Sequence, residues 1–268
     1  MICKLWIVFK LVWIDRMAYR VNFCLEILSG IVSSLIVVFL WLAIYKSSSR
    51  NFIGGYSLPE MVTYILGGGL INTFILTTAE NPETSQTIQD GSLSGMLIKP
   101  ISPYWIWLVR DFGSKSFLFS LGLSGYVLVF LFFRQYLVFS MSFGTLLMFL
   151  LSMGLAALLQ FLLFEALSLL AFWVENTYGI RFTMRVIMEV VGGAIIPLSF
   201  FPGMLQKVFG FLPFPYLIYL PMRIFLNKIA PGQISVEFIK EGLWILGLAI
   251  VNLVVWKAGI RQYVSMGD

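Results

Sequence analysis

Four ionisable side chains interrupt otherwise apolar stretches of this sequence, and they are the residues best suited to chemistry. They are Glu26, Glu165, Arg185 and Glu189. A charge placed in hydrocarbon is costly unless it is paired, hydrated or protonated. Arg185 and Glu189 lie four residues apart, so on a helix they share a face and can form an ion pair. Two interpretations remain open: a structural network that joins Arg185, Glu189 and Glu165, or a polar lining for a substrate entrance.

Several catalytic classes are excluded by what the sequence lacks. It contains no histidine, which is the commonest general base and the most frequent zinc ligand. It also lacks a glycine-rich loop that ends in Gly-Lys-Ser or Gly-Lys-Thr, so it cannot hydrolyse ATP through a P-loop. Gly122-Leu-Ser-Gly125 copies a motif of rhomboid proteases, but that serine depends on a histidine, and small residues favour close helix packing. We expect no catalytic residue and no bound metal or cofactor on this chain.

The elements that hold these side chains must be membrane-spanning helices. Of the 268 residues, 59% are hydrophobic and only 12% are charged, whereas a soluble globular domain carries about 25% charged residues. So many apolar residues exceed what one soluble core could bury, and most of them must face lipid or other helices. The net charge is +5, but the basic residues are spread singly, which does not favour nucleic-acid binding.

Apolar runs of about 20 residues predict an all-α membrane protein with six transmembrane helices in one domain, residues 1–268. The predicted spans are residues 21–45, 59–79, 112–133, 141–173, 182–200 and 241–258. Residues 1–20 carry too many charges to span and predict a helix in the membrane interface. The polar stretch 80–111 must lie outside the bilayer, so no aspartate falls inside a predicted span. The proline-rich segment 201–226 predicts short re-entrant helices within an extracellular region, residues 201–240.

Six spans place both chain ends on one side of the membrane. If that side is the cytoplasm, eleven Lys and Arg side chains lie inside against seven outside. Cytoplasmic loops carry an excess of basic residues. Both termini are therefore expected in the cytoplasm, and the polar stretch 80–111 is expected to be a cytoplasmic loop.

The predicted cytoplasmic loop contains a spaced set of residues, namely Gly91, Leu93, Leu97 and Pro100. This set resembles the Gly-x-Leu-x-x-x-Leu-x-x-Pro stretch that follows the second span in permease subunits of ABC type-2 exporters. The resemblance extends over the whole chain, because such permeases combine an interfacial N-terminal helix, six spans, this loop and re-entrant helices between spans five and six. It implies a subunit in a prokaryotic plasma membrane that exports a hydrophobic or amphipathic compound, such as a drug, a lipid or a peptide-like molecule.

The resemblance also implies partners. The chain would pair with a second permease, identical or paralogous, in the lipid membrane, and would dock on a dimer of separate ATP-binding subunits that carry ATP and Mg. In such exporters the loop forms a coupling helix seated in the ATPase, which we place at Thr87–Lys99. The residues carried over are Ile88, Gln89, Asp90, Gly91, Leu93, Met96, Leu97 and Lys99.

Within this segment the polar side chains are expected to face the ATPase, and the apolar ones to anchor on the membrane domain. The polar ones are Gln89, Asp90 and Ser92, and the apolar ones are Ile88, Leu93, Met96 and Leu97. The transport route in this family involves spans one, two and five. By helix position alone, the route candidates are therefore Glu26, the run Gly67–Gly69, Asn72 and Glu189.

Two other functions remain open. One is a secondary transporter that uses Glu26, Glu165 or Glu189 as a proton carrier, and transport that needs a proton gradient but no ATPase would identify it. The other is a membrane enzyme of lipid metabolism. The missing histidine disfavours the enzyme, and the activity of the purified chain on a lipid would identify it.

Overall fold

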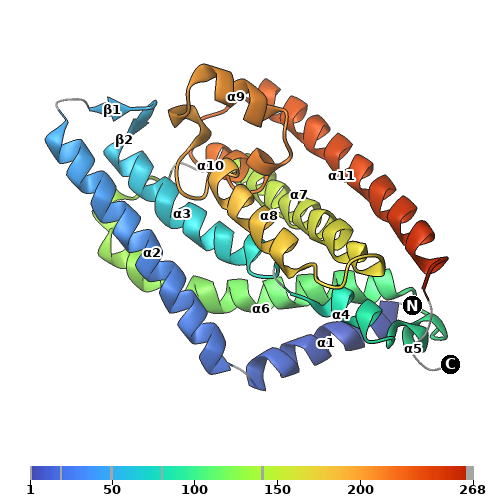
Figure 1. The fold of residues 1–268 in the computed structure, drawn as a ribbon. Helices are drawn as coiled ribbons and strands as arrows, with labels where there is room; N and C mark the ends of the chain where they lie inside the picture. Colours follow the sequence, from blue (N-terminus) through green and yellow to red (C-terminus); the bar gives the residue numbers. More distant parts are fainter. Residues whose placement is uncertain (1, 19, 49–50, 80, 140–141, 264–268) are drawn as a thin grey trace.

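The computed structural model describes residues 2–18, 20–48, 51–79, 81–139 and 142–263. Within them the chain is helical almost throughout, apart from a hairpin of two short strands, β1 (Phe52–Ile53) and β2 (Tyr56–Ser57) (Figure 1). The long helices are α1 (Ile2–Ala18), α2 (Arg20–Ser47), α3 (Leu58–Leu76), α6 (Pro103–Phe132), α7 (Phe143–Ser168), α8 (Tyr178–Val191) and α11 (Pro231–Ile260). The short helices are α4 (Glu83–Gln89), α5 (Leu93–Leu97), α9 (Gly203–Gly210), α10 (Tyr219–Phe225) and the 3-10 turns η1 (Arg134–Tyr136), η2 (Leu169–Phe172), η3 (Leu198–Phe200) and η4 (Phe214–Tyr216). Met1, Tyr19, Glu80 and Met141 belong to predicted elements but lie outside the described residues.

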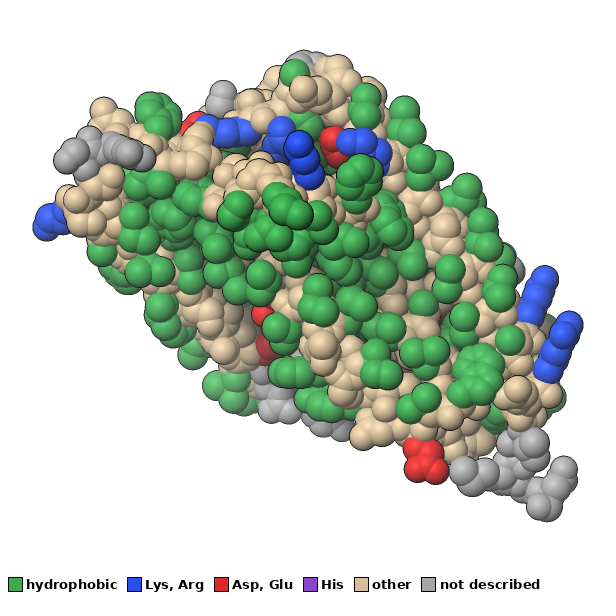
Figure 2. Space-filling view, turned by 45° about the horizontal axis from the view of Figure 1, so that its top comes forward, with side chains coloured by type: hydrophobic (Ala, Val, Ile, Leu, Met, Phe, Trp, Pro, Cys, Tyr) green, Lys and Arg blue, Asp and Glu red, His purple; other side chains and the backbone are tan. Residues whose placement is uncertain are grey.

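Helix α3 lies at the centre of the bundle, packed against α2, α6, α7 and α10. It begins where the Glu60 carboxylate accepts hydrogen bonds from the backbone N (2.7 Å) and the Oγ (2.9 Å) of Ser57, an arrangement that fixes a helix N-terminus. Its side chains Tyr64, Leu66 and Ile75 are fully buried. By contrast, most of α2 and α11 faces outward, and Figure 2 shows apolar side chains covering the middle of the visible face. The outer helices therefore present the apolar surface that a bilayer requires.

Among the described residues, four helices are long and apolar enough to cross a membrane. They are Cys24–Ser47, Pro103–Phe132, Phe143–Phe172 and Gly232–Ile260. A fifth is added only if α9 and Phe214–Phe225, which are bent by 83°, count as one broken span. The all-α membrane fold is confirmed, whereas the count of six spans and the re-entrant helices stay predictions. Helix α3 falls short because it carries glycines, Glu60 and Asn72, and α8 falls short because its 14 residues include two arginines and a glutamate.

The helix that contains the third predicted span begins earlier in the chain than predicted. Helix α6 starts at Pro103 rather than at residue 112, because proline fits the first helical turn after the non-helical Ser102. Asp111 and Lys115 therefore lie within the helix that contains this candidate span, and the expectation that no aspartate falls within the bilayer stays a prediction. Lys115 is fully buried and donates hydrogen bonds to the Asp111 carboxylate and to Gln160 Oε1 of α7. Mutual neutralisation makes this pair tolerable in an apolar helix.

The helix that contains most of the fifth predicted span ends earlier in the chain than predicted. Helix α8 stops at Val191, and Gly193 turns the chain with a φ of 87°. Tyr64 Oη donates a hydrogen bond of 2.6 Å to the Gly193 carbonyl, and a side chain at Gly193 would collide with the Tyr64 hydroxyl. A residue with a positive φ cannot continue an α-helix, and L-residues rarely adopt this conformation. The turn at Gly193 therefore keeps α8 from extending to Phe200.

The bundle has two distinct ends (Figure 1). At one end, the residue Tyr263 just after α11 contacts the turn between α4 and α5, where its Oη donates to the Gly91 carbonyl (2.7 Å). At the other end, the hairpin meets the segments after α8 and α10: Ser199 Oγ donates to the Gly54 carbonyl (2.9 Å), and Lys228 Nζ donates to the Gly55 carbonyl (2.8 Å). Helix α1 lies along α6, where Trp13 Nε1 donates to Ser116 Oγ (3.1 Å). The predicted N-terminal helix is therefore present, and its place in a membrane interface stays a prediction.

Candidate functional site

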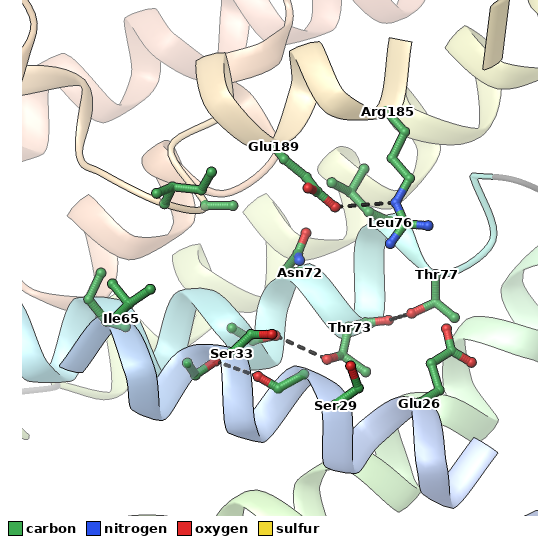
Figure 3. A pocket seen from close by; sticks show the side chains of 16 residues that line it. Glu26, Ser29, Ser33, Ile65, Asn72, Thr73, Leu76, Thr77, Arg185 and Glu189 are labelled. Carbon is green, nitrogen blue, oxygen red and sulfur yellow. Dashed lines mark hydrogen bonds and ion pairs between the residues drawn. The ribbon is translucent and has the colours of Figure 1, made fainter. Parts of the chain in front are cut away.

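A cavity of about 500 Å³ lies between α2, α3 and α8 (Figure 3). Helix α2 contributes Glu26, Ser29 and Ser33 to its wall, α3 and its C-cap contribute Asn72, Thr73 and Thr77, and α8 contributes Arg185 and Glu189. Figure 3 shows these polar side chains pointing into a common space. The predicted route candidates Glu26, Asn72 and Glu189 therefore meet in one place, and Arg185 lines the same cavity.

The polar side chains converge because each helix carries them at helical spacing. On α2, residues 26, 29, 30, 33, 34 and 37 recur at spacings of three and four, and on α3 and its C-cap residues 65, 69, 72, 73, 76 and 77 recur in the same way. Side chains at such steps share one face of a helix. The hydroxyl groups in this pattern are functional candidates that our sequence analysis missed, namely those of Ser29, Ser33, Ser34, Thr73 and Thr77. The spacing is the signal that could have identified them.

The glycine run of α3 serves mainly close packing. Gly69 lines the cavity, and a Cβ there would collide with Ser34 Oγ of α2 and Tyr126 Oη of α6. These two oxygens are 3.0 Å apart and form a buried hydrogen bond. A Cβ at Gly67 would come within 2.9 Å of Met222 Cε. The run therefore lets three helices approach one another, and Gly69 is its member that reaches the cavity.

The predicted pairing within α8 is present. Arg185 Nε donates a hydrogen bond of 3.2 Å to Glu189 Oε1, as their spacing predicts. About a third of each side chain is exposed, 33% and 30% respectively. The pair is therefore open to water and available to a solute in the cavity.

Glu165 lies elsewhere, and the predicted network that joins it to Arg185 and Glu189 is wrong. Its side chain is buried, and Thr84 Oγ1 of α4 donates a hydrogen bond of 3.0 Å to Glu165 Oε2. Glu165 lines a second, small cavity of about 30 Å³, together with Trp107, Asp111 and Gln160 among others. The reason is rotational: this face of α7 is turned toward α4 and α6 rather than toward α8. Glu165 thus supports the segment that follows α3.

That segment, predicted as a coupling helix over Thr87–Lys99, is two short helices. Helix α4 ends at Gln89 and α5 begins at Leu93. Between them Gly91 has a φ of 78°, and the backbone N of Ser92 donates a hydrogen bond of 2.9 Å to Asp90 Oδ1. Hydrogen bonds from Ser92 lower the pKa of the Asp90 carboxyl. A single continuous helix is therefore wrong, because a left-handed glycine cannot continue a helix. We call residues 83–99 the docking segment.

The apolar side of the docking segment is held by the bundle. Ile88 and Leu93 are buried against Trp107, Phe161 and Leu162, and Met96 is half-buried against the same cluster. These three side chains anchor the segment as expected.

Leu97 does not anchor the segment, because its side chain is 43% exposed and Ile98, next to it, is 86% exposed. Asp90, Ser92 and Lys99 are exposed as well. The outward face of the segment is therefore a mixed polar and apolar surface rather than a purely polar one.

Hydrogen bonds fix both ends of the turn in the docking segment. Tyr263 Oη, just after α11, donates to the Gly91 carbonyl (2.7 Å) and accepts a hydrogen bond from Ser94 N (3.3 Å). Gln89 Nε2 donates to the Glu175 carbonyl (2.5 Å), in the connection between α7 and α8. Gln89 therefore faces the membrane domain and not outward as predicted.

A family model described as ABC-2 family transporter protein matches residues 31–267. The match begins within α2 and includes α3, the docking segment and every later helix. A search of curated proteins finds no match. Within the described part of the chain, no group of three or more Cys, Asp or Glu side chains comes together to hold a metal ion. Since the family match covers most of the sequence, the chain belongs to the ABC-2 family of transporter proteins.

Proposed function

We propose that this chain is the membrane-spanning permease subunit of an ATP-driven exporter in a prokaryotic plasma membrane. The observation that carries the proposal is the docking segment, which is anchored by buried Ile88 and Leu93 while Asp90 and Ser92 are exposed at one end of the bundle. Such a surface suits a soluble partner. Since the sequence has no P-loop, the ATP and Mg would be held by a dimer of separate ATP-binding subunits.

The docking segment is connected to two of the three helices that line the cavity. Helix α3 leads into α4 through residues 77–82, and Arg181 of α8 donates a hydrogen bond of 2.5 Å to the Asn81 carbonyl in that connection. Gln89 holds the connection that precedes α8. Movement of the docking segment would therefore act on α3 and α8 together. This supports a cycle in which closure of the ATPase subunits reshapes the cavity and exposes it to alternate sides of the membrane.

The proposed topology has six passages, with α3 and α8 as polar inner spans and both termini in the cytoplasm. The polar content of α3 and α8 is acceptable because these helices line the cavity rather than face lipid alone. A second permease, identical or paralogous, would pack beside this one in the membrane. The family match favours the exporter over a proton-coupled carrier and over an enzyme of lipid metabolism.

The test is purification of the tagged chain from its native membranes in mild detergent, followed by mass spectrometry of the proteins that co-purify. Recovery of a P-loop ATPase is expected, and the presence or absence of a second permease distinguishes a heterodimer from a homodimer. Asp90→Arg, at an exposed position of the docking segment, should reduce ATPase recovery. Glu237→Gln, at the ion pair with Lys240 on α11, is the matched control and should not. If the native chain recovers no ATPase even after chemical crosslinking, the proposal is wrong.

A further inference from the structure

Three of the hydroxyl groups of the cavity wall, those of Ser34, Thr73 and Thr77, present acceptors rather than donors. Thr73 Oγ1 donates to the Gly69 carbonyl (3.1 Å), Thr77 Oγ1 donates to the Thr73 carbonyl (2.5 Å), and Ser34 Oγ donates to the Gly30 carbonyl (2.9 Å). A hydroxyl has one hydrogen to donate and two lone pairs that accept. Because these hydrogens are used by the helix backbones, the oxygens offer mainly lone pairs to whatever occupies the cavity.

The charged and amide side chains add to this excess of acceptors. Two carboxylates, Glu26 and Glu189, line the cavity together with one guanidinium, Arg185. Among the side chains that line the cavity, carboxylates therefore outnumber cations by two to one. Asn72 Oδ1 is buried and has no hydrogen-bond partner among the described residues. A buried acceptor without a donor costs free energy, so the cavity favours an occupant that donates hydrogen bonds.

The composition of the wall narrows the class of donor. None of the described residues that line the cavity is aromatic, although 16% of the chain is. Quaternary ammonium groups are recognised by aromatic cages, whereas a primary ammonium has three hydrogens to donate. Val37, Ile65, Leu76 and Ile195 also line the cavity, so part of the wall suits hydrocarbon. Its volume of about 500 Å³ lies within the range of small-molecule sites.

We infer that the cavity binds the polar end of an amphiphile that carries a primary ammonium group. The ammonium donates to the Glu26 carboxylate, to Asn72 Oδ1 and to the hydroxyl oxygens of α3, and the hydrocarbon lies against the apolar part of the wall. The inference rests on the proposed function in one respect: it takes the bound amphiphile to be the exported compound. It replaces the broad expectation of a hydrophobic or amphipathic compound with one chemical class.

The test uses the purified full-length chain in lipid nanodiscs, without ATPase subunits or ATP. Saturable binding of radiolabelled dodecylamine is measured above the uptake by empty nanodiscs, and unlabelled C12 compounds compete. Dodecylamine should compete at least about tenfold better than dodecyltrimethylammonium, dodecanol or dodecanoate, since the charge-assisted hydrogen bonds are lost in the analogues. Glu26→Gln and Asn72→Leu should each weaken dodecylamine binding several-fold or more. Glu237→Gln, outside the cavity, should bind as the native chain does.

Three outcomes would overturn the inference: no saturable binding, equal competition by all four compounds, or stronger competition by dodecanoate. If Glu26→Gln fails to fold, the binding measured for Asn72→Leu still decides the test. The Asn72 oxygen makes no hydrogen bond to the described residues, so its removal breaks none. The binding assay is independent of the ATPase. Failure to bind dodecylamine with an ATPase still recovered refutes only the ammonium site, and binding without a recoverable ATPase refutes only the exporter.

Discussion

The turn of the docking segment should depend on the absence of a side chain at Gly91. With a φ of 78°, this residue occupies the left-handed region, where an L-residue costs about 1–2 kcal/mol. Gly91→Ala should therefore raise the population of the locally opened segment by about 5-fold to 30-fold. Gly95→Ala is the matched control, because a Cβ there meets nothing within 4 Å and alanine stabilises a helix by roughly 0.5–1 kcal/mol relative to glycine.

The measurement is hydrogen–deuterium exchange of the peptide that covers residues 92–99, in nanodiscs. Its protected amides include Ser94 N, bonded to the Gly91 carbonyl and Tyr263 Oη, and Gly95 N, bonded to the Ser92 carbonyl. Exchange of this peptide should accelerate in Gly91→Ala and slow slightly in Gly95→Ala, with no change in the core of α7. The same ranking should appear in ATPase recovery. Equal exchange in the two variants would refute the assignment of strain to Gly91.

Three further results are expected. Leu93→Ala removes a fully buried side chain and should lower the free energy of unfolding by about 2–5 kcal/mol, seen as a lower Tm, whereas Leu97→Ala should leave the Tm nearly unchanged because that side chain is 43% exposed. Lys115→Met leaves the Asp111 carboxylate without its ammonium partner and should lower the free energy of unfolding by about 3–5 kcal/mol. A native Tm would contradict the role of this pair. Because the pKa of Asp90 is lowered in the folded protein by hydrogen bonds from Ser92, its stabilisation of the turn is present above the ordinary pKa of aspartate and is lost as the pH falls through the folded pKa. Exchange of residues 92–99, corrected for the intrinsic rate, should therefore stay constant from about pH 5 to 8 and rise below about pH 4, and Asp90→Asn should abolish this rise.

The docking segment illustrates how far sequence reasoning reached. Its place between α3 and α6, its buried Ile88 and Leu93, and its exposed Asp90 follow from the pattern of residues and from the resemblance. The break at Gly91 does not, because a glycine within a short amphipathic stretch is compatible with either a helix or a turn. The exposure of Leu97 could not be predicted either, since it depends on where the neighbouring helices end.

The polar cavity shows the same division. The spacing of Arg185 and Glu189 alone predicts that they share a helix face, and they do. That Glu26 and Asn72 join them, while Glu165 is turned toward Thr84, depends on how each helix is rotated about its own axis. Many contacts between helices set that rotation together, and no local pattern encodes it.

The sequence by itself determines that this is a helical membrane protein, because its apolar runs are too long and too numerous for a soluble core. It also determines which side chains share a face, since helical periodicity is local. Only the tertiary structure decides that Asp111 and Lys115 are buried together inside α6, that α8 stops at the turn around Gly193, and which glutamates meet. Each of these depends on the partner that a side chain finds on another helix, and that partner is supplied by packing over distances that the sequence pattern does not record.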